Sequence, residues 1–170
     1  MLRLLGWAVE GRFPEEKKVV VVVAPHTSNW DFIIGIICVW AIGIRLSFMI
    51  KSNAFKGPLG WVLKYLGGVP IERNAAHGVV GQMVDAFERR DALVLAIAPE
   101  GTRKKVESWK TGFYHIAERA AVPMQLVYFD YNRKVIGFGP VLRATENIHE
   151  DVDGMREFYR QFQARNPDLA

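Results

Sequence analysis

The run Val19 to Val23, five consecutive valines, constrains the fold of this chain more than any other stretch. An unbroken apolar run of this length is typical of a strand that is buried on both faces, as in a parallel sheet covered by helices. The sequence turns polar directly afterwards, at His26, and an apolar helical pattern begins near Asp31. The run therefore predicts an α/β fold, in which polar residues at strand exits are the first candidates for chemistry.

The rest of the chain alternates between strand-like and helix-like segments. Strands are expected near 19–23, 46–50, 69–73, 92–98, 123–131 and 134–143, and helices at 1–13, after Trp30, from Pro58 to Leu66, and at 75–90, 112–120 and 151–164. The helix between the first two of these strands makes a β-α-β unit, so we expect the two strands to form a parallel pair. The last two strands are expected to form a hairpin. Pro70 cannot donate to a central ladder, which predicts an edge position for its strand.

Composition limits the classes of protein that fit. A chain of 170 residues is expected to fold as a single domain with a mostly parallel mixed sheet flanked by helices. Its net charge of +4 suits anionic partners, such as lipid headgroups, coenzyme phosphates or nucleic acid. The single cysteine, Cys38, excludes an internal disulfide and favours a reducing compartment, where it is expected to be a buried thiol. No signal peptide is apparent, and the uncharged stretch 32–44 is too short to span a membrane.

The turn after the valine run has two interpretations. If Ser28 caps the helix, Asp31 falls in its first turn and can reach back to His26, holding one ring nitrogen protonated and leaving the other free to accept a proton. Alternatively, Ser28 to Asp31 is only a capping box, in which the carboxylate bonds to the N–H of the cap. The spacing alone leaves both interpretations open.

A second polar turn follows the strand at 92–98, and its sequence is Pro99-Glu-Gly-Thr-Arg103. Between these turns, residues 53–66 combine basic residues with Trp61 and Tyr65. That segment is either a face for a membrane surface or a core helix with solvated lysines. We expect an acyl chain, if one is bound, to follow the hydrophobic surface between Trp40 and Tyr65.

Four blocks stand in an order that resembles the glycerolipid acyltransferase family, typified by 1-acylglycerol-3-phosphate acyltransferase. They are His26-Thr-Ser-Asn-Trp-Asp31, which matches the family's His-x4-Asp motif, then Gly68-Val-Pro-Ile-Glu-Arg73, Pro99-Glu-Gly-Thr-Arg103 and Val122-Pro123-Met124. The resemblance covers residues 19–140, between a short N-terminal segment, 1–16, and a C-terminal helix within 141–170. Pro25, Pro70 and Ala98 depart from the usual residues of these blocks, at positions that shape the acceptor pocket in the family.

The resemblance implies transfer of an acyl chain from acyl-CoA or acyl-ACP to a hydroxyl of a lysophospholipid-type acceptor, most simply 1-acylglycerol-3-phosphate. His26 would be the general base and Asp31 its partner. By the same resemblance, the substrate-binding residues would be Arg73, Glu100, Gly101, Thr102 and Arg103. The two arginines would bind the acceptor phosphate, because guanidinium groups bind phosphate in a bidentate way. For the two arginines, the structural alternative is a surface salt bridge with Glu72 or Glu100.

Cofactors, partners and location follow from the same resemblance. It implies no bound cofactor and no metal, no nucleic-acid partner, and a cytoplasmic protein peripheral to the inner face of the membrane. Two other classes stay open. A thioesterase would use the same pair of residues to activate water, and a phospholipid-binding module without catalysis would keep the arginines but would not need His26.

Overall fold

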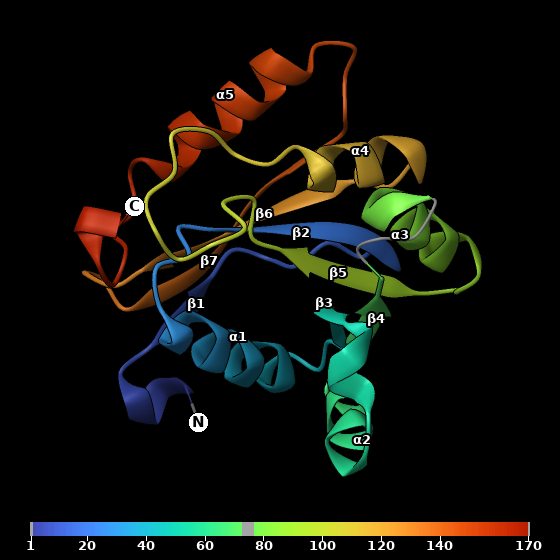
Figure 1. The fold of residues 1–170 in the computed structure, drawn as a ribbon. Coiled ribbons are helices and arrows are strands. Elements are labelled where there is room, and N and C mark those ends of the chain that lie inside the picture. Colours follow the sequence, from blue (N-terminus) through green and yellow to red (C-terminus); the bar gives the residue numbers. More distant parts are fainter. Residues whose placement is uncertain (1, 73–76, 170) are drawn as a thin grey trace.

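The computed structural model describes residues 2–72 and 77–169, within which seven strands form one sheet (Figure 1). The strands are β1 (Ala8–Glu10), β2 (Lys18–Ala24), β3 (Leu46–Lys51), β4 (Gly68–Ile71), β5 (Leu93–Ile97), β6 (Met124–Asp130) and β7 (Val135–Leu142). The helices are α1 (Asn29–Ala41), α2 (Pro58–Tyr65), α3 (Gly78–Glu88), α4 (Gly112–Arg119) and α5 (Ile148–Tyr159), with 3-10 turns η1 (Leu2–Leu5), η2 (Ser52–Phe55) and η3 (Pro167–Leu169). The α/β fold predicted from the valine run is confirmed.

The strand order is β1-β7-β6-β2-β5-β3-β4, which corrects one prediction. β2 and β3 run parallel but are not neighbours, because β5 lies between them and pairs with both. The β-α-β unit therefore skips one strand position. The predicted β6–β7 hairpin is confirmed as an antiparallel pair, and β4, which contains Pro70, lies at the edge of the sheet as expected.

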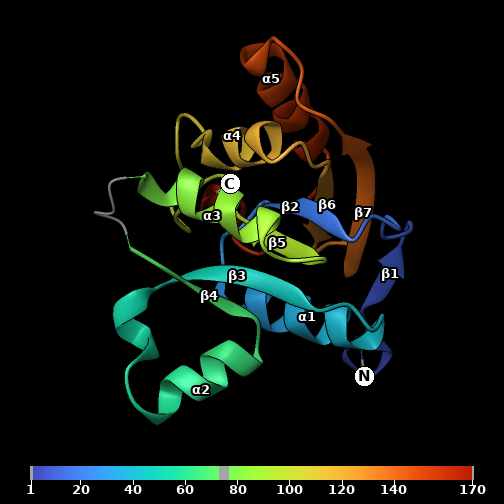
Figure 2. The same cartoon turned by 90° about the vertical axis from the view of Figure 1, so that its right-hand side faces the viewer.

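Helices cover both faces of the sheet, so each valine of β2 has a packing partner. Val19 and Val21 pack in one cluster with Ile34 and Cys38 of α1. Val20 and Val22 pack on the opposite face in the larger core, which contains residues of α3, α4 and α5. Figures 1 and 2 show the same arrangement, with α1 on one side of the sheet and α3, α4 and α5 on the other. All four of these valines are buried.

The N-terminal segment differs from the helix predicted for residues 1–13. Only η1 is helical, and the chain then turns at Gly6, whose φ is +74°, into β1. β1 pairs in parallel with β7, which would otherwise be an open edge, while Leu2 and Trp7 are buried beside α1. Sheet pairing and burial of Trp7 therefore outweigh the helical pattern. The C-terminal helix also shifts, because Asn147 caps α5 and starts it at Ile148 rather than Asp151.

The topology brings the two polar turns together. β2, β5 and β6 are adjacent and parallel, so the residues that follow them meet at one edge of the sheet. These residues include His26 after β2, Glu100 after β5 and Tyr131 after β6. Within the described ranges, none of the helices has the length and apolar composition needed to cross a bilayer.

Candidate active site

His26 and Asp31 form a close pair at the start of α1. The distance between Nδ1 of His26 and Oδ2 of Asp31 is 3.1 Å, and the side chains are 25% and 1% exposed. The same Oδ2 accepts hydrogen bonds from the backbone N–H groups of Thr27 and Ser28, at 3.0 and 2.9 Å. The two interpretations of this turn therefore hold at once: the carboxylate that closes the capping box also faces the imidazole.

Tyr131 completes the surroundings of the Asp31 carboxylate. Its hydroxyl donates a 2.5 Å hydrogen bond to Oδ1, the oxygen that does not face His26. Trp7 packs edge-on against Tyr131, with 4.9 Å between ring centroids. Burial and the Asp31 carboxylate both raise the pKa of the Tyr131 phenol, so it stays a donor at neutral pH. Asp31 is thus held by two backbone donors and one phenol, and its orientation toward the ring is fixed.

Glu100 lies on the other side of His26. Its carboxylate accepts the backbone N–H of His26, at 3.0 and 3.2 Å from the two oxygens. Burial raises the pKa of Glu100 to about 7, and the hydrogen bond from His26 opposes that rise only in part. Glu100 therefore ties the turn after β5 to the turn after β2.

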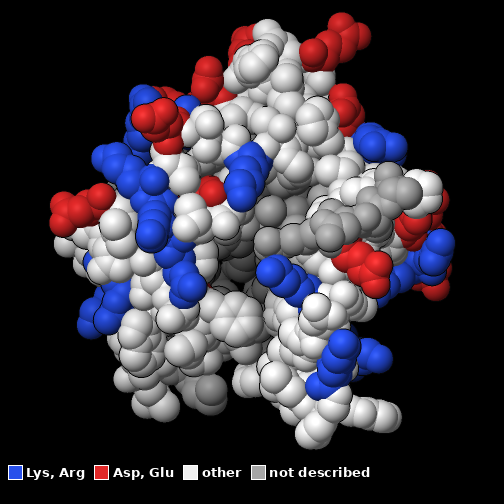
Figure 3. Space-filling view, viewed as in Figure 1, with Lys and Arg blue, Asp and Glu red and all other residues white. Residues whose placement is uncertain are grey.

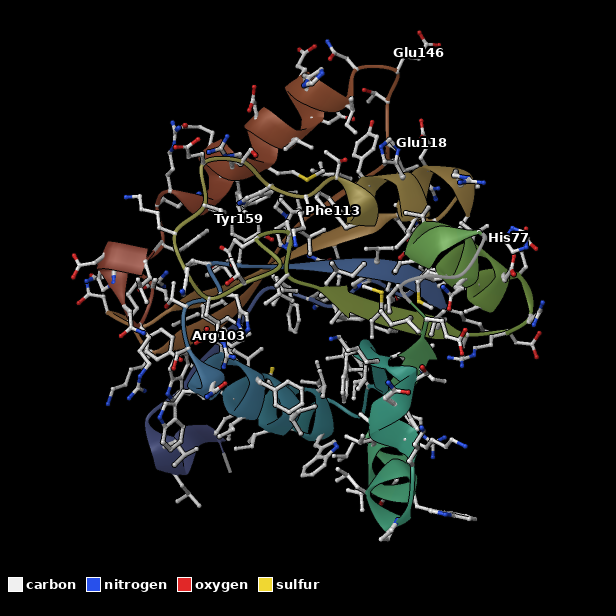
Figure 4. All side chains as sticks on the ribbon, viewed as in Figure 1. His77, Arg103, Phe113, Glu118, Glu146 and Tyr159 are labelled. Carbon is white, nitrogen blue, oxygen red and sulfur yellow. The ribbon has the colours of Figure 1, made fainter. Side chains whose placement is uncertain are left out.

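The remaining residues of the Pro99–Arg103 turn lie at the same edge of the sheet. Gly101 has a φ of +64° and lines an apolar pocket together with His26. Thr102 and Arg103 are exposed, and the Thr102 hydroxyl accepts the Lys104 N–H at 3.4 Å. Figure 4 shows Arg103 at the end of the sheet where α1 begins.

Arg73, the other arginine predicted to bind phosphate, lies outside the described residues. Ile71, at the end of β4, lines the same apolar pocket as His26. The pocket-lining residue Ile71 therefore precedes Arg73 by two positions in the sequence.

The pocket beside His26 has a volume of about 430 Å³ and lies between α1 and one face of the sheet. Apart from His26 and Asp31, its wall is apolar and includes Phe32, Gly35, Cys38, Phe48, Ala96 and Phe129. Burial raises the pKa of the Cys38 thiol to about 11, so this wall residue is uncharged at neutral pH. Neither Trp40 nor Tyr65 lines the pocket, so it lies apart from the surface on which we expected an acyl chain.

Sequence reasoning missed several residues that contact these two turns. Tyr131 follows the end of a parallel strand, and the rule that directed attention to His26 would have identified it too. Asn166 donates from its side chain to the Thr27 carbonyl at 2.9 Å, and its N–H bonds to the Thr27 hydroxyl at 3.2 Å. The Lys110 side chain lies so close to Gly101 that a Cβ there would be 2.9 Å from its Nζ. No local pattern indicates the last two contacts.

Comparison with known proteins identifies the family. A family model described as Acyltransferase matches residues 8–130. The 1-acyl-sn-glycerol-3-phosphate acyltransferase of Escherichia coli (strain K12) is 30% identical over a region covering 71% of this chain, which spans about half, 52%, of that relative. The crystal structure of the 1-acyl-sn-glycerophosphate (LPA) acyltransferase from Thermotoga maritima shares the fold, with a TM-score of 0.69, 19% identity and coverage of 94% of this chain and 72% of that one. The resemblance carried by the four sequence blocks is thereby confirmed: the chain belongs to the acyltransferase family.

Proposed function

We propose that this protein transfers an acyl chain from an acyl thioester to a hydroxyl of a lysophospholipid-type acceptor, with 1-acylglycerol-3-phosphate as the first candidate. The observation that carries the proposal is the His26–Asp31 pair at one end of an apolar pocket. A base beside an apolar pocket suits a reaction that joins a polar hydroxyl to a fatty acyl group. The names of the Escherichia coli and Thermotoga maritima relatives support the acceptor class.

His26 is the general base of the proposed reaction. An alcohol is a poor nucleophile at neutral pH, so the base removes its proton as it attacks the thioester carbonyl. Because Nδ1 faces Asp31, Nε2 is the nitrogen that accepts this proton. The new C–O bond forms, the C–S bond breaks, and the imidazolium returns the proton to the thiolate that leaves. Asp31 stabilises the imidazolium and is not itself protonated.

The acceptor phosphate is assigned to the arginines that follow β4 and β5. Arg103 is exposed at the carboxyl edge of the sheet, and Arg73 is assigned to the same phosphate because it closes the Gly68-Val-Pro-Ile-Glu-Arg73 block. Gly101 lets a substrate approach the backbone, and Thr102 supplies a hydroxyl. Glu100 acts on this site through the backbone of His26 rather than through Arg103.

The acyl chain is assigned to the pocket between α1 and the sheet. Its volume of about 430 Å³ lies within the range of roughly 300–1,000 Å³ typical of ligand pockets, and its wall is almost wholly apolar. The donor is acyl-CoA or acyl-ACP. We place the protein in the cytoplasm, peripheral to the inner face of the membrane, because the acceptor and the acylated product are lipids whereas the thioester carrier is water-soluble.

The deciding experiment incubates wild type and His26→Ala with acyl thioesters and a panel of lysolipids, and identifies the products by mass spectrometry. Wild type is expected to form the diacyl product only when acceptor and thioester are both present. His26→Ala is expected to lose about 10²–10⁴-fold in kcat/KM, the usual contribution of a general base. Ser108→Ala, an exposed residue, serves as the matched surface substitution.

Two results would overturn the proposal. Release of free fatty acid at the same rate with and without acceptor would indicate a thioesterase. Full turnover by the His26→Ala protein would remove the base from the mechanism.

A further inference from the structure

The helix α1 is apolar on the side that faces away from the sheet as well as on the side that packs on it. Ile34 and Cys38 are buried against the sheet. Trp30, Ile33 and Trp40, at helical spacing on the outward side, are 50%, 44% and 59% exposed. A helix that is apolar all round is normally buried all round. The Arg165 guanidinium lies over the Trp30 ring, 5.3 Å from its centroid, and within the described residues the rest of this outward side lacks the cover that its composition calls for.

The helix α2 extends this uncovered surface. Gly60 is its one buried residue, whereas Trp61 is 82% and Tyr65 87% exposed, and Val62 between them is 52% exposed. Figures 1 and 2 show α2 projecting from the body of the protein on the same side of the sheet as α1. A Cβ on Gly60 would lie 2.0 Å from the Phe55 carbonyl oxygen, so α2 packs closely on η2, the turn that precedes it. Its aromatic side chains thus extend into solvent from a helix that packs on η2.

The charge of this region is one-sided. From Phe32 to Ile71 the sequence contains no aspartate or glutamate and four basic residues, Arg45, Lys51, Lys56 and Lys64. The whole chain has 22 basic and 18 acidic residues, so the remainder is balanced at 18 of each and this segment carries the entire net charge of +4. In Figure 3 the lower part of the molecule, where Figure 1 places α1 and α2, shows white and blue atoms but no red ones.

The apolar pocket shares one wall residue, Phe32, with the exposed part of α1. Phe32 lines the pocket and is 46% exposed, and its ring packs edge-on against Phe48 of β3, also in the pocket wall. A chain that enters past Phe32 therefore passes the outward side of α1. Phe32 is thus shared by the pocket wall and the exposed part of α1.

We propose that the outward sides of α1 and α2, defined by Trp30, Ile33, Trp40, Trp61, Val62 and Tyr65 and here called the docking face, rest on a bilayer that contains anionic phospholipids. Aromatic and aliphatic side chains enter the interface while the lysines bind headgroup phosphates. A second copy of the chain is the poorer fit, because a two-fold contact would set four cations against four cations with no anion between them. This inference rests on the proposed function, since a lipid substrate is what the docking face would deliver to the pocket.

The test is co-sedimentation with vesicles, which requires no turnover. Wild type is mixed with vesicles of phosphatidylcholine alone and of phosphatidylcholine with phosphatidylglycerol. Two double variants separate the apolar from the electrostatic contribution to binding. Trp61→Ala/Tyr65→Ala removes the aromatic side chains, and Lys56→Gln/Lys64→Gln removes two positive charges. Val141→Ser/Arg119→Gln changes an exposed apolar residue and an exposed basic residue away from the docking face. Light scattering follows the oligomeric state, and circular dichroism checks that each variant folds.

Wild type and the Val141→Ser/Arg119→Gln control are expected to bind the anionic vesicles at least tenfold more tightly than the neutral ones. Each docking-face variant is expected to lose tenfold or more in partitioning, consistent with about 1 kcal/mol per basic residue at an anionic surface. Equal binding by wild type and both variants would overturn the proposal. So would a wild-type dimer that the variants break.

Catalysis separates this inference from the proposed function. With a short-chain thioester and a water-soluble acceptor, the docking-face variants are expected to turn over at the wild-type rate, and His26→Ala is expected to bind vesicles like wild type. Vesicle binding without any acyl transfer by wild type would refute the function alone. Acyl transfer without vesicle binding would refute the docking face alone.

Discussion

Tyr131 and Asp31 are joined by a 2.5 Å hydrogen bond from the phenol to the carboxylate oxygen that does not face His26. The phenol follows the end of β6 and the carboxylate lies in the first turn of α1, so the bond connects two elements at the edge of the sheet where the residues after β2, β5 and β6 meet. The bond holds Oδ1 of Asp31 while Oδ2 faces the imidazole. Tyr131 is therefore a positioning residue, which acts on His26 through Asp31.

Tyr131→Phe is expected to lower kcat about tenfold or more and to leave KM nearly unchanged. Hydrogen bonds to charged groups contribute about 1.5–3 kcal/mol, and about 1.4 kcal/mol corresponds to a factor of ten. Without the phenol, more negative charge remains on the oxygen atoms beside the ring, so the protonated imidazole is held more strongly. The acid limb of the kcat/KM profile should then move to higher pH. Initial rates measured across a pH series check both expectations.

Tyr128→Phe is the matched control for this prediction. Its hydroxyl also bonds to a carboxylate, that of Glu10, but away from His26. The control should change neither kcat nor the pH profile. If both variants lost the same activity with unchanged profiles, Tyr131 would have only a structural role.

Glu100 makes stability depend on pH. Burial raises the pKa of its carboxyl from 4.5 to about 7, so the folded protein holds this proton more tightly than the unfolded chain does. The stabilisation is full below pH 4.5 and is lost as the pH rises to about 7. Glu100→Gln removes the titration and should gain stability relative to wild type over that window. The gain is a few kcal/mol at most, since one pKa unit corresponds to about 1.4 kcal/mol.

Urea unfolding at a series of pH values measures this difference. Glu107→Gln, an exposed carboxyl in the loop that leads to α4, should show no such trend. A constant difference between Glu100→Gln and wild type from pH 4.5 to 7 would contradict the assignment.

The parts of the fold that could be predicted from sequence are those decided by local pattern. The valine run predicted the buried position of β2, and Pro70 predicted the edge position of β4. Each of these predictions depends only on a few adjacent residues. The insertion of β5 between β2 and β3 could not be predicted in this way. The order of strands depends on contacts between segments that are distant in the sequence, so no local pattern indicates which strand lies beside β2.

The candidate site shows the same division. His26 and Asp31 are five positions apart, so their contact could be inferred from one turn of sequence. Tyr131 and Asn166 contact that turn from 100 and 139 residues away in the sequence. Their contacts depend on the ends of β6 and of the C-terminal segment arriving at one edge of the sheet, which only the assembled structure shows.

Asn166→Ala is expected to loosen the turn that carries His26. Its side chain donates to the Thr27 carbonyl at 2.9 Å, and that bond is lost in the variant. A net loss of about 0.5–1.5 kcal/mol in the free energy of unfolding is expected. Activity should fall by more than this loss of stability explains, because the residue beside Thr27 is the base.

Thermal unfolding and kcat measured on the same samples check this prediction. Gln161→Ala, in which a side-chain bond to the Phe158 carbonyl is lost outside the site, should lose stability without a fall in kcat. Full activity of Asn166→Ala at temperatures well below its midpoint would show that the C-terminal contact is not needed for catalysis.

The acyl-chain assignment can be tested by filling the pocket from α1. Gly35 lines the pocket, and a Cβ there would meet its nearest neighbour, Cζ of Phe129, at 3.5 Å, which is ordinary contact. In Gly35→Leu the Cβ therefore fits without a close contact, the substitution favours the helix by up to about 1 kcal/mol, and the rest of the side chain occupies space in the pocket. We expect kcat/KM for a palmitoyl thioester to fall tenfold or more, while the value for a butyryl thioester stays within about twofold, since each buried methylene contributes about 0.8 kcal/mol. Gly35→Ala, which adds only the Cβ, should remain close to wild type with both donors. Equal losses for the long and the short donor in Gly35→Leu would mean that the acyl chain lies outside this pocket.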